Sequence, residues 1–267
     1  KPSLYCMSRD GGKDALKKDL EAEDICVEDG LICQNALRIS GYDSLYRLRG
    51  FREGRCFVQD ESSMLAASIA DVKEGQFVLD LCSAPGGKAL YMADQMHGTG
   101  MVIARDLTED KTNLIEENIE RTELENIRTE VFDARNLDEE MISKADVVLA
   151  DLPCSGLGIM GRKNDIKYNV SLDGMEDLVK LQKKILENAA AYVKPGGVLI
   201  YSTCTINPAE NQENYQWIRE KAELEPVDLR PYLPERLQID TAKEGYIQLL
   251  PGVHPCDGFF VGKLRRK

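Results

Sequence analysis

The run FVLDLCSAPGGK, residues 77–88, decides the fold class of this chain. A short apolar segment of the kind found in buried strands ends in a turn that carries Gly86 and Gly87. Residues 88–96 then follow a helical pattern. The two glycines permit close approach to the backbone, and the start of the helix offers free N–H groups to an anionic or polar ligand. A strand that passes through such a turn into a helix is the repeating unit of a parallel α/β sheet.

The same alternation continues outward from this unit. Apolar, β-branched runs predict further strands at residues 101–105, 127–132, 147–150 and 198–202. Helical patterns occupy residues 109–121 and 175–193, and Lys194-Pro195-Gly196-Gly197 marks a stop. Parallel strands joined by crossover helices need this order of elements. We therefore predict a doubly wound α/β domain.

The regions on either side differ from this pattern. Downstream we expect a helix at 209–221 and an antiparallel hairpin formed by 245–250 and 258–264. Upstream, we expect a strand at 3–8, a helix at 13–22 and short strands around 25–29 and 31–37. We predict a small α/β accessory domain at residues 1–54 and a second domain at residues 55–267.

Composition limits the class of protein. The chain has 267 residues, of which 43% are hydrophobic, enough for one substantial core. It contains no apolar run near the roughly 20 residues that a membrane span needs, and KPSLYCMSRD lacks the apolar core of a signal peptide. We expect a cytoplasmic protein with reduced thiols. Eight cysteines without a CxxC pair, and only two histidines, argue against a metal site.

The formal net charge of −12 argues against a protein that coats nucleic acid non-specifically, because phosphate affinity comes mainly from lysine and arginine. An RNA substrate remains compatible with this charge, since basic residues can gather on one face. Taken alone, each basic cluster is more often a solvated face. The clusters are Arg47, Arg49, Arg52 and Arg55; Arg162, Lys163 and Lys167; and Lys263, Arg265, Arg266 and Lys267.

A carboxylate ends each of four successive strands: Asp80, Asp106, Asp133 and Asp151. Open α/β sheets bind ligands at the carboxyl edge of their strands, where these side chains would gather. A helix-capping role remains the alternative for any one of them. The chain lacks the G-x-G-x-x-G motif of a dinucleotide site in this region. A Walker motif needs Ser or Thr directly after its lysine, and Ala89 follows Lys88 instead. The pattern favours a nucleoside ligand without a diphosphate.

Two cysteines follow the fourth and the fifth predicted strands, at 147–150 and 198–202. Cys154 lies in DLPCSGLG at 151–158, and Cys204 lies in YSTCT at 201–205. Core residues are expected within strands rather than just beyond them, although core filling remains the alternative. At the ligand edge, the two thiols could face one substrate.

These motifs closely resemble the Sun (Fmu) family of RNA cytosine-5 methyltransferases. The resemblance starts at FVQDESS, residues 57–63, and continues to the C-terminus through LDLCSAPGGK, DLPCSGLG, GRKNDIKY, STCTINPAENQENY and DGFFVGKL. It implies a Rossmann-like class I methyltransferase domain that uses S-adenosylmethionine. The first 54 residues resemble, more loosely, the small RNA-binding domain that precedes the catalytic domain in this family.

The resemblance also implies catalytic roles. Cys204 would add to C6 of the cytosine, and Cys154 would assist release. Asp151 would hydrogen-bond the N3 and amino edge of the base. Lys88 would position the nucleotide or lower a thiol pKa, with a solvated lysine as the alternative. The family often has Ser after the Thr-Cys cysteine, and Thr205 keeps the hydroxyl.

Cofactor and RNA contacts are implied in the same way. The backbone of residues 83–87, in the turn after the first strand, would hold the methionine moiety of the cofactor. Asp106 would bind the ribose and Asp133 the adenine, and Asp151 would lie beside the cofactor. Arg162, Lys163 and Lys167 would hold phosphates or the flipped nucleotide. The loop residues concerned are Cys82, Ser83, Ala84, Pro85, Gly86, Gly87 and Lys88.

The resemblance is greatest to the bacterial enzyme that methylates small-subunit (16S) ribosomal RNA, and we expect a monomer. That enzyme usually carries a further helical N-terminal domain, so we expect a fragment or a shorter relative. Transfer RNA and large-subunit ribosomal RNA remain alternative substrates. A methyltransferase of another class, acting on DNA, protein or a small molecule, and a non-catalytic ribosome-assembly factor also remain open.

Overall fold

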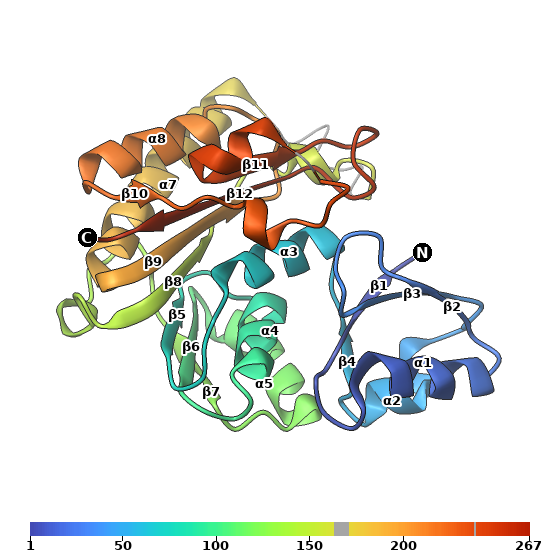
Figure 1. Cartoon of the computed structure of the whole chain (residues 1–267). Helices are drawn as coiled ribbons and strands as arrows, with labels where there is room; N and C mark the ends of the chain where they lie inside the picture. Colours follow the sequence, from blue (N-terminus) through green and yellow to red (C-terminus); the bar gives the residue numbers. More distant parts are fainter. Residues whose placement is uncertain (163–170, 238) are drawn as a thin grey trace.

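A twisted, mostly parallel sheet forms the centre of the protein (Figure 1). The computed structural model describes residues 1–162, 171–237 and 239–267. Its main sheet has the order β10-β12-β9-β8-β5-β6-β7, with β11 paired to β12. The parallel strands are β5 (Phe77–Asp80), β6 (Met101–Asp106), β7 (Ile127–Val131), β8 (Ala145–Asp151) and β9 (Val193–Thr203). The prediction of a doubly wound, Rossmann-like sheet is confirmed.

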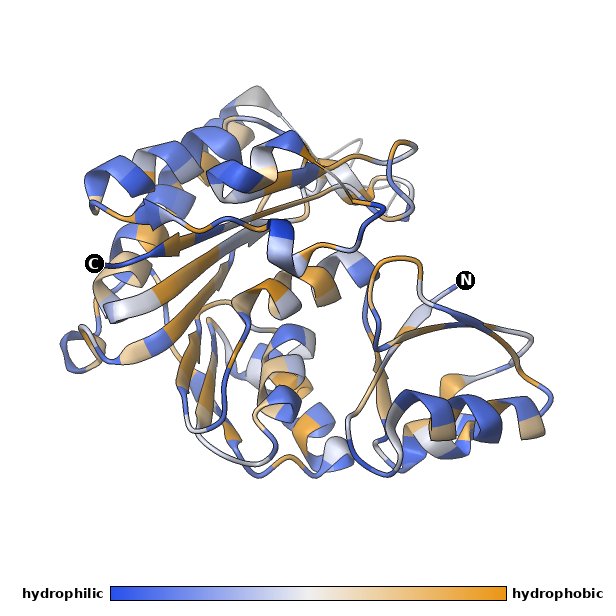
Figure 2. Ribbon diagram, viewed as in Figure 1, coloured by the Kyte–Doolittle hydropathy of each residue, from blue (hydrophilic) through white to orange (hydrophobic). Residues whose placement is uncertain are grey.

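Helices cover both faces of this sheet, because successive residues of each strand point to opposite faces. Val78 and Val147 belong to the core beneath α3 (Glu61–Ala70), α4 (Gly87–Gln95) and α5 (Glu109–Thr122). Leu79 and Val148 belong to the core beneath α7 (Leu172–Tyr192) and α8 (Gln212–Lys221). Figure 2 shows the hydrophobic residues along the strands and on α3. Parallel strands buried on both faces account for the nearly continuous apolar runs in the sequence.

The C-terminal strands close one edge of the sheet. β11 (Tyr246–Leu249) and β12 (Phe259–Arg265) pair antiparallel, which confirms the predicted hairpin. β12 also pairs antiparallel with β9 and with β10 (Glu225–Pro226).

Two predicted boundaries near β9 are wrong. The Lys194–Gly197 run lies inside β9, where the register with β8 shifts, instead of separating helix from strand. The helix expected from residue 209 begins at Gln212. The Glu210 side chain accepts a hydrogen bond from Ser155, which follows β8, and the Asn211 side chain donates to the Thr205 carbonyl, which follows β9, so the segment before the helix is a turn.

The N-terminal unit is a separate four-stranded antiparallel sheet of order β2-β3-β1-β4. The strand expected around 31–37 is displaced to β3, because the Glu61 carboxylate accepts the backbone N–H groups of residues 31–33 and holds them in a turn. The sheet includes residues 56–58, beyond the boundary predicted at residue 54. The RNA-binding role of this unit stays a prediction. Its elements are β1 (Ser3–Cys6), α1 (Gly12–Ala22), β2 (Cys26–Asp29), β3 (Ala36–Ser40), α2 (Arg49–Arg52) and β4 (Cys56–Val58).

Buried polar contacts attach this unit to α4 and α5 (Figure 1). The Asp94 carboxylate of α4 accepts hydrogen bonds from Tyr5 Oη at 2.6 Å and from the backbone N–H of Ser8. Arg121 of α5 donates to two backbone carbonyls of the unit and lies over the Phe51 ring. Among the described residues, no helix has the length and apolar character to cross a membrane.

Candidate active site

Two thiols meet at the carboxyl edge of the sheet. Cys154 follows β8 and Cys204 follows β9, and their Sγ atoms lie 3.3 Å apart because the two strands are neighbours. The hydrogen bond between them, together with burial, raises the pKa of Cys154 well above its usual range. The same hydrogen bond lowers the pKa of Cys204 against the opposing effect of burial. Cys204 is therefore the thiol more easily converted to thiolate.

A carboxylate and a cation lie beside the thiols. Asp151, the last residue of β8, accepts a hydrogen bond from Ser202 Oγ at 2.7 Å and forms an ion pair with Lys88 at 2.5 Å. Lys88 belongs to the first turn of α4, and its side chain is largely buried. The cation also contributes to the lowered pKa of Cys204. The structure thus brings together the four predicted catalytic residues, and Lys88 is not the solvated lysine of the alternative reading.

The segments 151–158 and 201–211, which we call the thiol half of the site, pack backbone to backbone. The Gly158 N–H donates to the Cys204 carbonyl at 3.0 Å, and the Gly258 N–H donates to the Gly158 carbonyl at 2.9 Å. A Cβ atom at residue 158 would lie 2.1 Å from the Gly258 carbonyl oxygen. Only glycine fits there, so this close approach explains the residue type.

The segment 80–88, together with Asp106 and Asp133, forms what we call the loop half. Its backbone is folded back on itself, with the Ser83 N–H donating to the Arg105 carbonyl and the Gly86 N–H donating to the Ser83 carbonyl. Gly86 has a φ of 101°, in the left-handed region that favours glycine. These bonds fix the start of α4 against the sheet.

A cavity of about 250 Å³ opens between the loop half, α3 and Asp151. Typical ligand pockets measure about 300–1,000 Å³, so it encloses only part of a nucleoside-sized ligand. Eight of the residues that line it were predicted as site residues or strand-end carboxylates: Asp80, Cys82, Ser83, Ala84, Pro85, Gly87, Lys88 and Asp151. The sequence reasoning missed Val58, Gln59, Asp60 and Ser63. The FVQDESS run was the available signal, because it opens the segment that resembles the family.

Several buried polar atoms around this cavity have no hydrogen-bond partner among the described residues. They are Gln59 Oε1, Asp80 Oδ1 and Ser83 Oγ. Burial raises the pKa of Asp80 to about 7. Unpaired buried polar atoms are costly, and three that line one cavity point to a polar ligand that would satisfy them. The loop half therefore fits a ligand with amino and hydroxyl donors.

Asp106 and Asp133 lie outside the lining of this cavity. Asp106 is buried, and its carboxylate accepts the Ala84 N–H at 2.9 Å and pairs with Lys111. Asp133 forms a two-oxygen ion pair with Arg135, which lowers the pKa of its carboxyl. The structure gives both carboxylates local partners, and their contacts to ribose and adenine stay predictions.

Arg162 is the one predicted RNA contact within the described residues, and Lys163 and Lys167 lie outside them. Its guanidinium forms ion pairs with Asp60 at 2.5 Å and with Asp257 at 2.9 Å. The side chain is still 57% exposed. Arg162 therefore lies near the cavity but is already paired with two carboxylates of the protein.

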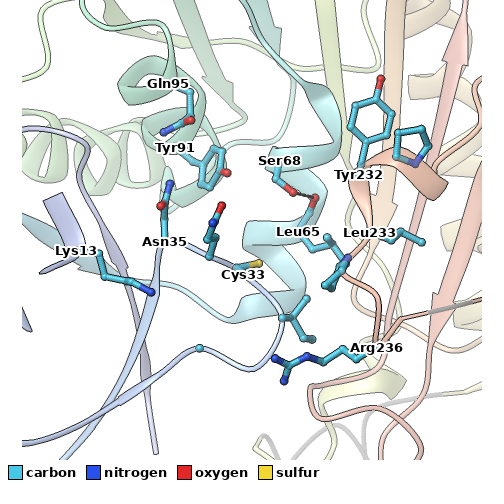
Figure 3. A pocket seen from close by; sticks show the side chains of 15 residues that line it. Lys13, Cys33, Asn35, Leu65, Ser68, Tyr91, Gln95, Tyr232, Leu233 and Arg236 are labelled. Carbon is cyan, nitrogen blue, oxygen red and sulfur yellow. Dashed lines mark hydrogen bonds between the residues drawn. The ribbon is translucent and has the colours of Figure 1, made fainter.

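A larger cavity, of about 630 Å³, lies where α3 and α4 meet the N-terminal unit and the 231–236 segment (Figure 3). Lys13 and Arg236 lie on opposite sides of it. None of the predicted site residues lines it. The smaller cavity is therefore the one that reaches the predicted catalytic residues, because Lys88 and Asp151 line it, although Cys154 and Cys204 are not part of its lining. Among the described residues no group of three or more His, Cys, Asp or Glu side chains could hold a metal ion.

Comparisons with known proteins identify the family of the chain. The chain is 38% identical over 255 residues to the probable ribosomal RNA small subunit methyltransferase B of Bacillus subtilis. The aligned region covers 94% of this chain and 57% of the relative. The structure is similar to a crystal structure of a methyltransferase homologue from Pyrococcus horikoshii, with a TM-score of 0.82 and 26% identity. The match covers 100% of this chain and 87% of the homologue. It is also similar to the crystal structure of NSun6 from P. horikoshii with SFG, with a TM-score of 0.74 and 28% identity. That match covers 87% of this chain and 59% of NSun6.

The chain spans about half the length of the curated relatives it matches. Residues 67–265 match the family described as 16S rRNA methyltransferase RsmB/F, and this match confirms the resemblance to the Sun family. Both cysteine motifs and the glycine loop lie inside the matched range. The chain therefore belongs to the RsmB/F family of 16S rRNA methyltransferases.

Proposed function

We propose that this protein transfers a methyl group from S-adenosylmethionine to C5 of a cytosine in RNA, with 16S ribosomal RNA as the substrate. The observation that carries the proposal is the pair of thiols at 3.3 Å beside the Asp151–Lys88 ion pair. A single-displacement methyltransferase, and equally a non-catalytic assembly factor, has no use for two thiols at this place. A covalent route through cytosine has a use for both.

The chemistry assigns a separate task to each thiol. C5 of cytosine is a weak nucleophile, so the Cys204 thiolate first forms a bond to C6, which shifts an electron pair toward C5. The cofactor supplies the electrophilic methyl group that C5 then takes. A base then accepts the C5 proton, the electron pair of the broken C5–H bond re-forms the C5–C6 double bond, and the Cys204 sulfur leaves as a thiolate with the electron pair of the C6–S bond. Cys154 assists this last step, as a thiol close enough to exchange a proton with the reacting group.

Asp151 and Lys88 serve the charged stages of this route. An Asp151 oxygen directed at the N3 and amino edge would stabilise the ring as it gains electron density during attack at C6. Lys88 fixes that carboxylate, and it favours the thiolate form of Cys204. The lowered pKa of Cys204 and the raised pKa of Cys154 support this division of roles.

The loop half would hold the cofactor. S-adenosylmethionine carries an amino group and ribose hydroxyls, which match the unpaired Gln59, Asp80 and Ser83 oxygens. The relative NSun6 from P. horikoshii has been crystallised with SFG, an analogue of this cofactor. Asp106 and Asp133 continue the same edge toward β6 and β7, where the ribose and adenine would extend beyond the cavity.

A tritium-release assay tests the reaction. RNA labelled with tritium at C5 of cytosine should release one tritium for each methyl group transferred, and RNA labelled at other ring positions should release none. The full chain is incubated separately with 16S ribosomal RNA, 23S ribosomal RNA and transfer RNA. We expect release with 16S RNA only, and the Cys26→Ala variant, which alters an exposed thiol of the N-terminal unit, should behave as wild type. Methyl transfer without tritium release would contradict C5 chemistry, and release with another RNA alone would reassign the substrate.

A further inference from the structure

Glu210 is a fully buried carboxylate in the turn between Cys204 and α8. Its Oε1 atom accepts hydrogen bonds from Ser155 Oγ at 2.6 Å and from Asn207 Nδ2 at 2.9 Å. Its Oε2 atom accepts from the Ser155 N–H and from Gln182 Nε2, each at 2.9 Å. All four donors are neutral groups. Burial of a carboxylate is costly, and a complete set of hydrogen bonds offsets that cost.

The donors come from three separate segments. Ser155 follows Cys154, Asn207 lies just after Cys204, and Gln182 lies on α7. The second amide hydrogen of Gln182 donates to the Pro153 carbonyl at 2.9 Å. Glu210 is therefore linked to the residues on both sides of Cys154, directly through Ser155 and through Gln182 to Pro153.

A chain of hydroxyls extends the same connection to the other thiol. Ser155 Oγ lies 2.6 Å from Glu210 Oε1 and 2.7 Å from Thr205 Oγ1. An ionised carboxylate can only accept, so the Ser155 hydroxyl donates to Glu210 and the Thr205 hydroxyl must donate to Ser155. Thr205 Oγ1 accepts in turn from the Asn207 N–H at 3.3 Å. Ser155 and Thr205 are the residues directly after the two cysteines.

We propose that Glu210 is a positioning residue that holds the thiols of Cys154 and Cys204 at contact distance, so that both act on one base. The functional part of this inference rests on the proposed cytosine-5 chemistry. Glu210 itself does not line the cavity and acts through Ser155 and Thr205. The hydroxyl at residue 205 then has a definite task, which Ser can perform and Val cannot.

The first experiment removes one hydroxyl without changing the side-chain shape. Thr205→Val breaks the chain between Ser155 and Asn207, whereas Thr205→Ser keeps it. We expect Thr205→Val to lower kcat about tenfold with the KM for RNA unchanged, because one hydrogen bond in a buried charged network is lost. Thr205→Ser should restore the wild-type kcat. Equal kcat values for the Val and Ser variants would overturn the role of the chain.

The second experiment measures the distance between the thiols without any methyl transfer. Phenylarsine oxide condenses with two nearby thiols to form two As–S bonds and one water. Bound arsenic, mapped by mass spectrometry, should bridge Cys154 and Cys204 in the wild type and should be lost in Cys154→Ala and Cys204→Ala. Glu210→Ala should weaken this bridging about tenfold or more, because the buried network loses its common acceptor.

Asn188→Ala is the matched control, because it removes a buried side-chain hydrogen bond elsewhere on α7, to the Ala134 carbonyl. It should bridge arsenic as the wild type does. Wild-type bridging by a folded Glu210→Ala protein would overturn the proposal, and if that variant fails to fold, the Thr205 pair decides. Normal bridging in a wild-type protein that leaves RNA cytosine unmethylated would refute the proposed function while the positioning of the thiols stands.

Discussion

The two halves of the site differ in how their buried polar groups are satisfied. In the thiol half, Glu210 accepts four hydrogen bonds, and its neighbours bond to one another. In the loop half, Gln59, Asp80 and Ser83 each keep a buried oxygen without a partner among the described residues. Both halves lie on the same edge of one sheet, so the difference lies in the side chains rather than in the fold.

This difference corresponds to two kinds of task. Thiols that must act at the two ends of one bond need fixed positions, and hydrogen bonds within the protein to both oxygens of Glu210 supply them. A cofactor that enters and leaves must supply hydrogen bonds that the protein itself lacks. The thiol half is therefore preorganised, whereas the loop half is completed by its ligand. Substitutions confined to one half test its task separately from the other.

The largest expected effect belongs to Gly158→Ala in the thiol half. The new methyl group would lie 2.1 Å from the Gly258 carbonyl oxygen and 2.7 Å from the Cys204 carbonyl oxygen. We expect loss of methyl transfer and a decrease of about 3 kcal/mol in the free energy of unfolding. Thermal unfolding and a methyl-transfer assay measure the two effects. Gly161→Ala is the control, because a Cβ there meets no atom of the described residues within 4 Å, and equal behaviour of the two variants would contradict the close approach.

Lys88→Gln should have the next largest effect. The cation holds Asp151 and helps the Cys154 hydrogen bond to lower the pKa of Cys204. Without it the Cys204 pKa rises, so the acid limb of the pH–rate profile should move to higher pH, and the rate should fall about a hundredfold.

Lys111→Gln provides the comparison from the loop half, because Lys111 pairs with Asp106 and is half exposed. It should leave the acid limb in place. If Lys88→Gln leaves the acid limb of the pH–rate profile unchanged, Lys88 does not lower the pKa of Cys204.

Asp80→Asn tests the loop half through stability. Burial raises the Asp80 pKa to about 7 from an ordinary value of 3.8, so the folded state holds the proton more tightly than the unfolded state. The stability that this group contributes is full below the ordinary pKa and is lost as the pH rises through about 7. Wild type should therefore lose about 2 kcal/mol more than Asp80→Asn between pH 5 and pH 8.

Chemical denaturation at the two pH values measures this difference in the free energy of unfolding. Asp133→Asn is the control, because the Asp133 pKa is lowered and its carboxyl stays ionised from pH 5 to pH 8. If wild type and Asp80→Asn show the same pH dependence, Asp80 is not the unsatisfied acid of the loop half.

Arg162→Gln should have the smallest effect. The guanidinium is exposed and already paired with Asp60 and Asp257, so an RNA phosphate would have to displace them. We expect a change of less than about 1 kcal/mol in unfolding and a loss of about threefold in RNA affinity. Binding titrations at two salt concentrations measure this. A hundredfold loss with a reduced salt dependence would show instead that Arg162 contacts phosphate directly.

The sequence predicted the five parallel strands, the edge of the sheet and the meeting of the two thiols. Those inferences depend on short-range patterns and on one rule, that parallel strands end at a common edge. Cys154 and Cys204 could be paired because their strands are neighbours. Lys88 could be placed at that edge because it begins the helix after the first strand.

The remaining features depend on contacts between distant segments. The Glu61 carboxylate moves the expected 31–37 strand, and Glu210 delays the start of α8, yet neither interaction has a local pattern. Gln59 and Asp60 join the cavity only because the chain from the N-terminal sheet enters α3 beside the loop half. The roles of Asp106 and Arg162 stay predictions, and their partners within the protein, Lys111 for Asp106 and Asp60 and Asp257 for Arg162, could not be inferred from spacing.

The most direct test of the central claim is covalent trapping of RNA by the two cysteine variants. Each variant is incubated with substrate RNA and S-adenosylmethionine, and the products are separated on denaturing gels. With Cys204 as the nucleophile and Cys154 as the residue that assists release, Cys154→Ala should accumulate a protein–RNA adduct and Cys204→Ala should form none. An adduct formed by Cys204→Ala but not by Cys154→Ala would contradict the account and reverse the two roles.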